Sequence, residues 1–139
     1  MKFAIRLPAN ILYKAFTSPW EATLTPDKAV HFAREVDGLA FDYLWVAEHI
    51  VQPPKLVPSM GAKFYEGVAA AGFLLGATQR IRVLTYVCPI PYHNPLVWAK
   101  AIASVDHLSG GRLSLGLSAG HLRREFEARS DGERAVDMA

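Results

Sequence analysis

The sequence predicts an α/β fold built on a parallel sheet. Short apolar runs begin near residues 2, 43, 81 and 112, and patterns typical of helices separate them. Strands that alternate with helices at this spacing are characteristic of βαβ units and therefore of parallel strands. This order leaves two architectures open, an open doubly wound sheet or about half of a (β/α)8 barrel. A whole barrel takes ~250 residues, and this chain has 139.

The first unit begins with a strand over residues 2–7, which Pro8 closes. A loop over residues 9–24 leads to Thr25-Pro26, where the threonine can cap a helix and the proline suits its first position. Apolar residues then recur at helical spacing, and Gly38 marks the end of this helix.

The later units repeat the same order of elements. Residues 43–47 are continuously apolar, as in a parallel strand that is covered on both faces. A long loop follows, to about Phe64. We then expect a helix over 66–78, a strand over 81–87, a helix that starts at Asn94-Pro95, and a strand over 113–117.

Composition restricts the class of protein. The chain is 51% hydrophobic and 20% charged, with a formal net charge of +2, which is typical of a globular domain. Its basic residues are scattered, so we expect no nucleic-acid partner. No apolar run approaches the ~18 residues of a membrane span, and the first apolar run is too short for a signal peptide. The single Cys88 excludes an internal disulfide and suits a reducing compartment, so we expect a cytoplasmic protein.

Common catalytic and metal-binding motifs are missing from the sequence. The five histidines show neither HExxH nor paired-cysteine spacing, and we therefore expect no metal site. No GxSxG, P-loop or GxGxxG motif is present, which counts against a dinucleotide-binding domain. His121 and Glu125 lie four residues apart on an expected helix, where an exposed side-chain pair is the ordinary outcome.

Functional groups of parallel α/β folds gather where the strands end. Glu48-His49 is the most polar pair at any of these positions. An imidazole with a pKa near ~6.5 can exchange a proton with a substrate or cofactor, although a histidine that only caps the strand is the alternative. The run Thr85-Tyr86-Val87 could form an apolar wall for a flat ring, or simply strand core.

Five segments in order resemble the luciferase-like monooxygenase family. The run Phe41–His49 is similar to the family's second-strand signature, with Ala40 where the family has glycine. Further similarity lies in Ala77–Val83, Asn94–Lys100, Asp106–Leu113 and the stretch from Gly116 to Glu125-Phe126.

This resemblance implies a half (β/α)8 barrel over residues 1–128, followed by a divergent tail over residues 129–139. It implies that His49 is the active-site histidine. It also implies that Thr85, Tyr86 and Val87 form a bulged strand end against the cofactor ring, where the family often has a non-proline cis peptide. Asp106 and Arg112 are expected to brace the structure away from the catalytic face.

The resemblance further implies an oxidoreductase that uses coenzyme F420 or, alternatively, FMN. Light-producing luciferases carry an arginine where this chain has Ala119, which favours the F420-dependent branch and hydride transfer to or from a small organic substrate. An FMN-dependent monooxygenase and a non-catalytic truncated remnant are the alternatives. The implied partners are the small-molecule substrate and either further copies of the chain or a missing C-terminal half.

Overall fold

The computed structural model describes residues 1–127 except 12, 14, 122 and 124. The predicted tail over residues 129–139 lies outside this part of the chain. Four strands, β1 (Ala4–Arg6), β2 (Tyr43–Val46), β3 (Arg82–Pro89) and β4 (Leu113–Ser118), form one sheet in which every pairing is parallel.

The strands lie in the order β1-β2-β3-β4, so neighbours in the sequence are neighbours in the sheet. A doubly wound sheet reverses its strand order at a switch point, whereas a barrel adds each strand beside the previous one. The observed order therefore confirms the barrel-type arrangement and excludes the open doubly wound sheet for these four strands.

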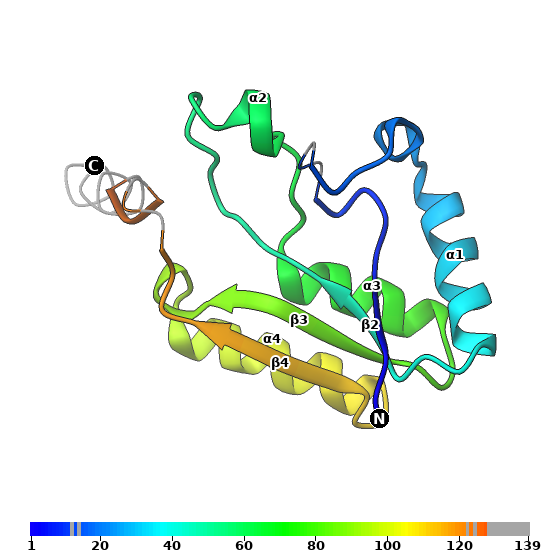
Figure 1. Cartoon of the computed structure of the whole chain (residues 1–139). Helices are drawn as coiled ribbons and strands as arrows, with labels where there is room; N and C mark the ends of the chain where they lie inside the picture. The colour runs from blue at the N-terminus through cyan, green and yellow to red at the C-terminus, as the bar shows by residue number, and fades with distance from the viewer. Residues whose placement is uncertain (12, 14, 122, 124, 128–139) are drawn as a thin grey trace.

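Helices α1 (Pro26–Gly38), α3 (Gly67–Ala77) and α4 (Pro95–Leu108) connect successive strands and cover one face of the sheet (Figure 1). Short turns of helix, η1 (Pro19–Thr23), α2 (Val57–Met60) and η2 (Ile90–Tyr92), lie in the segments that follow β1, β2 and β3. The loop expected to run to Phe64 thus contains one short helix, and β3 extends two residues beyond the expected Val87.

Local capping explains where two of the long helices begin. The Thr25 side chain accepts a hydrogen bond from Lys28 N at 3.4 Å. Asn94 Oδ1 accepts from Leu96 N at 3.1 Å and from Val97 N at 3.3 Å. In both helices proline follows the cap, where its missing N–H costs nothing. Both predicted starts are confirmed.

The hydrophobic core lies between the sheet and the helices. Its largest fully buried side chains include Leu44 and Val46 of β2, Val83 of β3 and Leu74 of α3. Burying a side chain of this size stabilises the fold by about 1.5–3 kcal/mol. Because alternate residues of a strand face opposite sides, Trp45, Leu84 and Tyr86 point to the other face, which would become the barrel interior.

Arg112 and Asp106 brace the amino-terminal edge of the sheet, as expected. The Arg112 guanidinium donates to Leu75 O at 2.8 Å, to Thr78 Oγ1 at 3.1 Å and to Ile81 O at 3.2 Å. Asp106 Oδ1 accepts from Leu113 N at 3.2 Å. These contacts tie the end of α3 and the end of α4 to the starts of β3 and β4. Among the described residues, no helix has the length and apolar character needed to cross a membrane.

Candidate functional site

The strand end that carries Glu48 and His49 is fixed by a buried asparagine. The Asn10 side chain donates to Ala47 O at 3.1 Å and accepts from Ala47 N, so it closes a two-bond pair with the backbone just beyond β2. Asn10 is fully buried, and an amide in this setting holds its partner peptide in one orientation. The two residues that follow Ala47 therefore leave the strand in a defined direction.

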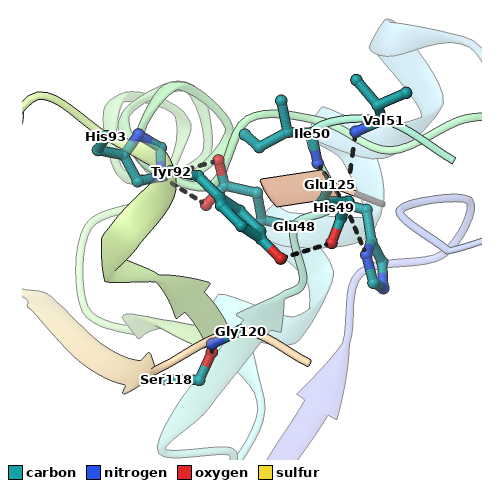
Figure 2. Close-up of polar contacts among 9 residues, drawn as sticks. All are labelled: Glu48, His49, Ile50, Val51, Tyr92, His93, Ser118, Gly120 and Glu125. Atoms are coloured by element: carbon teal, nitrogen blue, oxygen red, sulfur yellow. Dashed lines mark hydrogen bonds and ion pairs between the residues drawn. The ribbon is translucent and has the colours of Figure 1, made fainter. Parts of the chain in front are cut away.

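His49 is held by a carboxylate that lies 76 residues away in the sequence. Its Nδ1 lies 3.1 Å from Glu125 Oε1 (Figure 2). The ring also makes edge contacts with Phe64 and His121, at centroid distances of 4.7 Å and 5.8 Å. Only 14% of the His49 side chain is exposed. A histidine in these surroundings has one ring orientation, with Nδ1 directed at Glu125.

Glu125 joins three segments of the site. Its Oε1 also accepts hydrogen bonds from the backbone N–H groups of Ile50 at 3.1 Å and Val51 at 3.4 Å, and its Oε2 accepts from the Tyr92 hydroxyl at 2.9 Å (Figure 2). Glu125 is only 3% exposed. Because all these neighbours donate, the carboxylate acts as the acceptor, and the same role toward His49 assigns the Nδ1 proton to the imidazole.

Tyr92 and Gly120 form the other side of this cluster. Burial, reinforced by the charge and hydrogen bond of Glu125, raises the pKa of the Tyr92 hydroxyl to about 12. Gly120 has φ +75°, and a Cβ at this position would lie 2.9 Å from the Tyr92 hydroxyl oxygen. A glycine is therefore required both for the backbone turn after β4 and for the close approach of Tyr92.

A second polar cluster surrounds Glu48, which points to the opposite side of the strand end. His93 Nε2 lies 3.2 Å and 3.3 Å from the two Glu48 carboxylate oxygens (Figure 2). The His93 ring is stacked on Trp98. Burial raises the pKa of Glu48, although the hydrogen bond from Cys88 and the charge of His93 each lower this pKa in part. Burial and then the Glu48 charge raise the pKa of the Cys88 thiol. Glu66, the N-cap of α3, lies close enough to share a metal ion with Glu48 and His93.

The end of β3 contains the irregularity that the family resemblance implies. The register with β4 shifts between Thr85 and Cys88, and the Tyr86–Val87 peptide bond is cis. Tyr86 is 62% exposed, and its ring meets the edge of Trp45 at a centroid distance of 5.5 Å. Two aromatic rings on the inner face suit a flat, largely apolar cofactor ring.

Thr85 differs from its neighbours because its side chain is fully buried. Its hydroxyl donates to Gly116 O at 3.1 Å and accepts from Gly116 N at 3.0 Å. A Cβ on Gly116 would lie 2.3 Å from Thr85 O, so β4 approaches β3 here as only glycine allows. Thr85 thus holds the two strand ends together.

The structure brings most of the predicted site residues to one edge of the sheet. Val46 pairs with Thr85 across β2 and β3, so Glu48-His49 and Tyr86-Val87 follow at the same carboxyl edge. The expectation of an exposed His121–Glu125 pair is wrong, because Glu125 is buried against His49. Tyr92 and His93 were not anticipated as members of the site. Their one signal in the sequence is their position directly after the third predicted strand.

A parallel sheet in barrel order, with helices on one face and a polar site at its carboxyl edge, identifies this chain as part of a (β/α)8 barrel. A family model described as luciferase-like monooxygenase matches residues 1–137. The chain belongs to this family.

Some of the proteins similar to this chain are named for different cofactors. The chain is 30% identical to 4-hydroxyprotoasukamycin monooxygenase of Streptomyces nodosus subsp. asukaensis, over 81% of this chain and 30% of that protein. It is 33% identical to FMNH2-dependent dimethylsulfone monooxygenase of Pseudomonas fluorescens, over 58% of this chain and 22% of that protein. A solved F420-dependent secondary alcohol dehydrogenase, in complex with an F420–acetone adduct, is 26% identical with a TM-score of 0.54. That match covers 70% of this chain and 28% of that one.

The chain spans only part of the proteins that it matches. It covers between 17% and 40% of the length of the curated relatives. The solved structures match with TM-scores from 0.54 to 0.70, over 28% to 39% of their own chains. The fold and the family are therefore shared, while activity, substrate and cofactor are matters for proposal.

Proposed function

We propose that this chain provides the first half of a luciferase-like (β/α)8 oxidoreductase that transfers hydride between coenzyme F420 and a small organic substrate. The observation that carries this proposal is the fixed position of His49. A buried carboxylate orients its ring at the same sheet edge where Tyr86 is exposed near the end of β3. Polar groups beside an aromatic wall are what a redox cofactor and its substrate need from the protein.

In this proposal His49 is the catalytic residue. Because Nδ1 donates its proton to Glu125, Nε2 is the ring nitrogen that is available to a substrate. It can accept a substrate proton or orient a polar group beside the cofactor. Glu125 is a positioning residue, which acts by holding the ring and its tautomer, as carboxylates commonly do for functional histidines.

The proposed cofactor wall consists of Tyr86 and Val87, supported by Thr85. The Tyr86 ring lies against Trp45 on the inner face, and the Thr85 hydroxyl holds β4 beside the irregular end of β3. When bound, a deazaflavin or flavin ring would supply the hydride chemistry. The role of the protein is to position the ring, exclude water on one side and place His49 beside the reacting atoms.

Two observations support F420 over FMN. Ala119 stands where light-producing luciferases have a phosphate-binding arginine, and one related structure at 26% identity is F420-dependent. An FMN-dependent monooxygenase is the second candidate function, and the 33% identical FMNH2-dependent relative favours it. Both candidates use the same wall and the same histidine.

The test is a pair of fluorescence titrations, with F420 and with FMN, on the chain completed with the second half of a related barrel. We expect tighter binding of F420, with Tyr86→Ala weakening it and the exposed Leu108→Ala, at the end of α4, leaving it unchanged. Equal or tighter binding of FMN would select the second candidate. Binding of neither cofactor would identify the chain as a non-catalytic remnant.

A further inference from the structure

Glu48, Glu66 and His93 meet on the side of the strand end that faces away from His49. They come from three separate segments: the end of β2, the start of α3 and the turn after β3. One ligand atom from each residue lies within 4.8 Å of the other two. The two Glu48 oxygens lie 3.2 Å and 3.3 Å from His93 Nε2. Ligand atoms about 2.0–2.2 Å from a tetrahedral zinc ion are separated by about 3.3 Å, so this spacing suits one ion.

The Glu48 carboxylate is hydrogen-bonded at only one of its two oxygens among the described residues. Its side chain is completely buried, and its Oε1 accepts no hydrogen bond from the described residues. Only Oε2 has hydrogen-bond geometry toward His93, although both oxygens lie at similar distances from the ring nitrogen. A buried carboxylate oxygen that lacks a donor is stabilised by a cation beside it. A buried oxygen without a donor distinguishes this cluster from an ordinary group of acidic residues on the surface.

The other two residues are held in place by contacts outside the cluster. The His93 ring is stacked on Trp98 at a centroid distance of 4.6 Å and an angle of 4°, which fixes the direction of Nε2. Glu66 is held by Ala69 N, which donates to its Oε2 as part of the cap of α3. Glu66 and His93 also line a groove of about 610 Å³ between α3 and α4, so an ion and its water ligands can reach the cluster from solvent.

We propose that Glu48, Glu66 and His93 form a binding site for one zinc-like divalent cation. One imidazole and two carboxylates are suited to Zn²⁺, whereas Mg²⁺ and Ca²⁺ prefer oxygen ligands alone. Three protein ligands leave a fourth position for water from the groove. The ion would tie together the segments that follow β2 and β3 and the start of α3, next to the residue proposed as catalytic.

This metal site does not depend on the proposed cofactor or reaction, so the two proposals can fail separately. The test is calorimetric titration with Zn²⁺ of the chain completed with the second half of a related barrel, after treatment with a chelator. We expect one Zn²⁺ per chain and a rise in melting temperature on zinc addition. A Co²⁺ titration should give the visible absorption of a tetrahedral site, and Mg²⁺ should not compete.

Variants locate the ion. We expect Glu66→Gln and His93→Gln each to weaken zinc binding at least about tenfold, since even residues behind a metal ligand carry effects of 10–100-fold. Glu66→Gln keeps an oxygen that can accept from Ala69 N, so it should fold, and circular dichroism without metal checks this. His107→Gln removes an exposed imidazole at the end of α4 and should leave binding unchanged. Absence of zinc binding, or binding that survives both ligand variants, would overturn the proposal.

Discussion

At the scale of single residues, His49 depends on a partner that is remote in sequence. If it exchanges a proton with the substrate, His49→Ala should lower turnover by about 10²–10⁴-fold in a chain completed with a second barrel half. The circular dichroism spectrum should stay unchanged, and His107→Ala provides a control for loss of an exposed imidazole. Unchanged turnover in folded His49→Ala would leave this histidine with the structural role of capping β2.

Two glycines of α3 offer a matched test of packing beside Glu48. A Cβ at Gly67 would lie 2.5 Å from Cys88 Sγ and 3.2 Å from Glu48 Oε2, whereas a Cβ at Gly76 meets nothing within 4 Å. We expect Gly67→Ala to lower the free energy of unfolding by about 1–3 kcal/mol through overpacking. Gly76→Ala should raise it by about 0.4–1 kcal/mol. Urea unfolding of the two variants measures both, and equal effects would contradict the packing at Gly67.

At the scale of elements, Asp37 links α1 to the start of β3. Its carboxylate accepts hydrogen bonds from the backbone N–H groups of Gln79 at 2.7 Å, Arg80 at 2.9 Å and Ile81 at 2.6 Å. Burial alone would raise the pKa of Asp37, but these donors and the Arg80 guanidinium together hold it below its ordinary value of 3.8. The charged carboxylate therefore stabilises the junction between the two elements.

The lowered pKa gives this junction a defined dependence on pH. The stabilisation is fully present above the unfolded pKa and is lost as the pH falls through the lower folded pKa. We expect Asp37→Asn to reduce the free energy of unfolding by about 1–3 kcal/mol at pH 7. The difference from the unmodified chain should shrink below pH ~4. Urea unfolding at several pH values tests this, with Glu35→Gln on the same helix as the control. A difference that is constant with pH would contradict it.

The elements also show which parts of the fold a sequence can predict. The caps at Thr25 and Asn94 act within three residues, so their helices could be placed from local patterns. The apolar run of β2 and the glycines after α4 are equally local signals. The short helix α2 carried no such pattern within its proline-containing loop, and its start has no side-chain cap.

The candidate site was only partly predictable for the same reason. His49 and the Thr85–Val87 strand end follow predicted strands, so their positions at the carboxyl edge could be inferred. Glu125 contacts His49 across 76 residues, and Glu48 meets His93 across 45. Sequence motifs with fixed spacing identify functional residues that lie on one helix or turn. These two pairs form only because neighbouring strands end side by side.

At the scale of the whole molecule, the described chain leaves apolar surface uncovered. Strands β1 and β4 each have a strand partner on one side only. Leu115 and Leu117 of β4 pair in register with Thr85 and Cys88, so they face the helix-covered side, yet Leu117 remains 47% exposed. In α4 no residue is fully buried, and Leu96 is 83% exposed. Open strand edges and apolar faces of this kind bind a partner or aggregate.

We therefore expect the 139-residue chain, produced by itself, to be an oligomer or an aggregate that is not a self-sufficient enzyme. Barrel enzymes frequently hold phosphate groups with the loops after their seventh and eighth strands. Cofactor affinity should therefore be weak even where Tyr86 and Trp45 form a wall. Adding a matching second barrel half should cover β1, β4 and the exposed face of α4 and restore a single species. Analytical ultracentrifugation with a redox assay measures both properties. A stable monomer that binds cofactor tightly and turns over would show that the four βα units suffice, and would refute the need for a partner half.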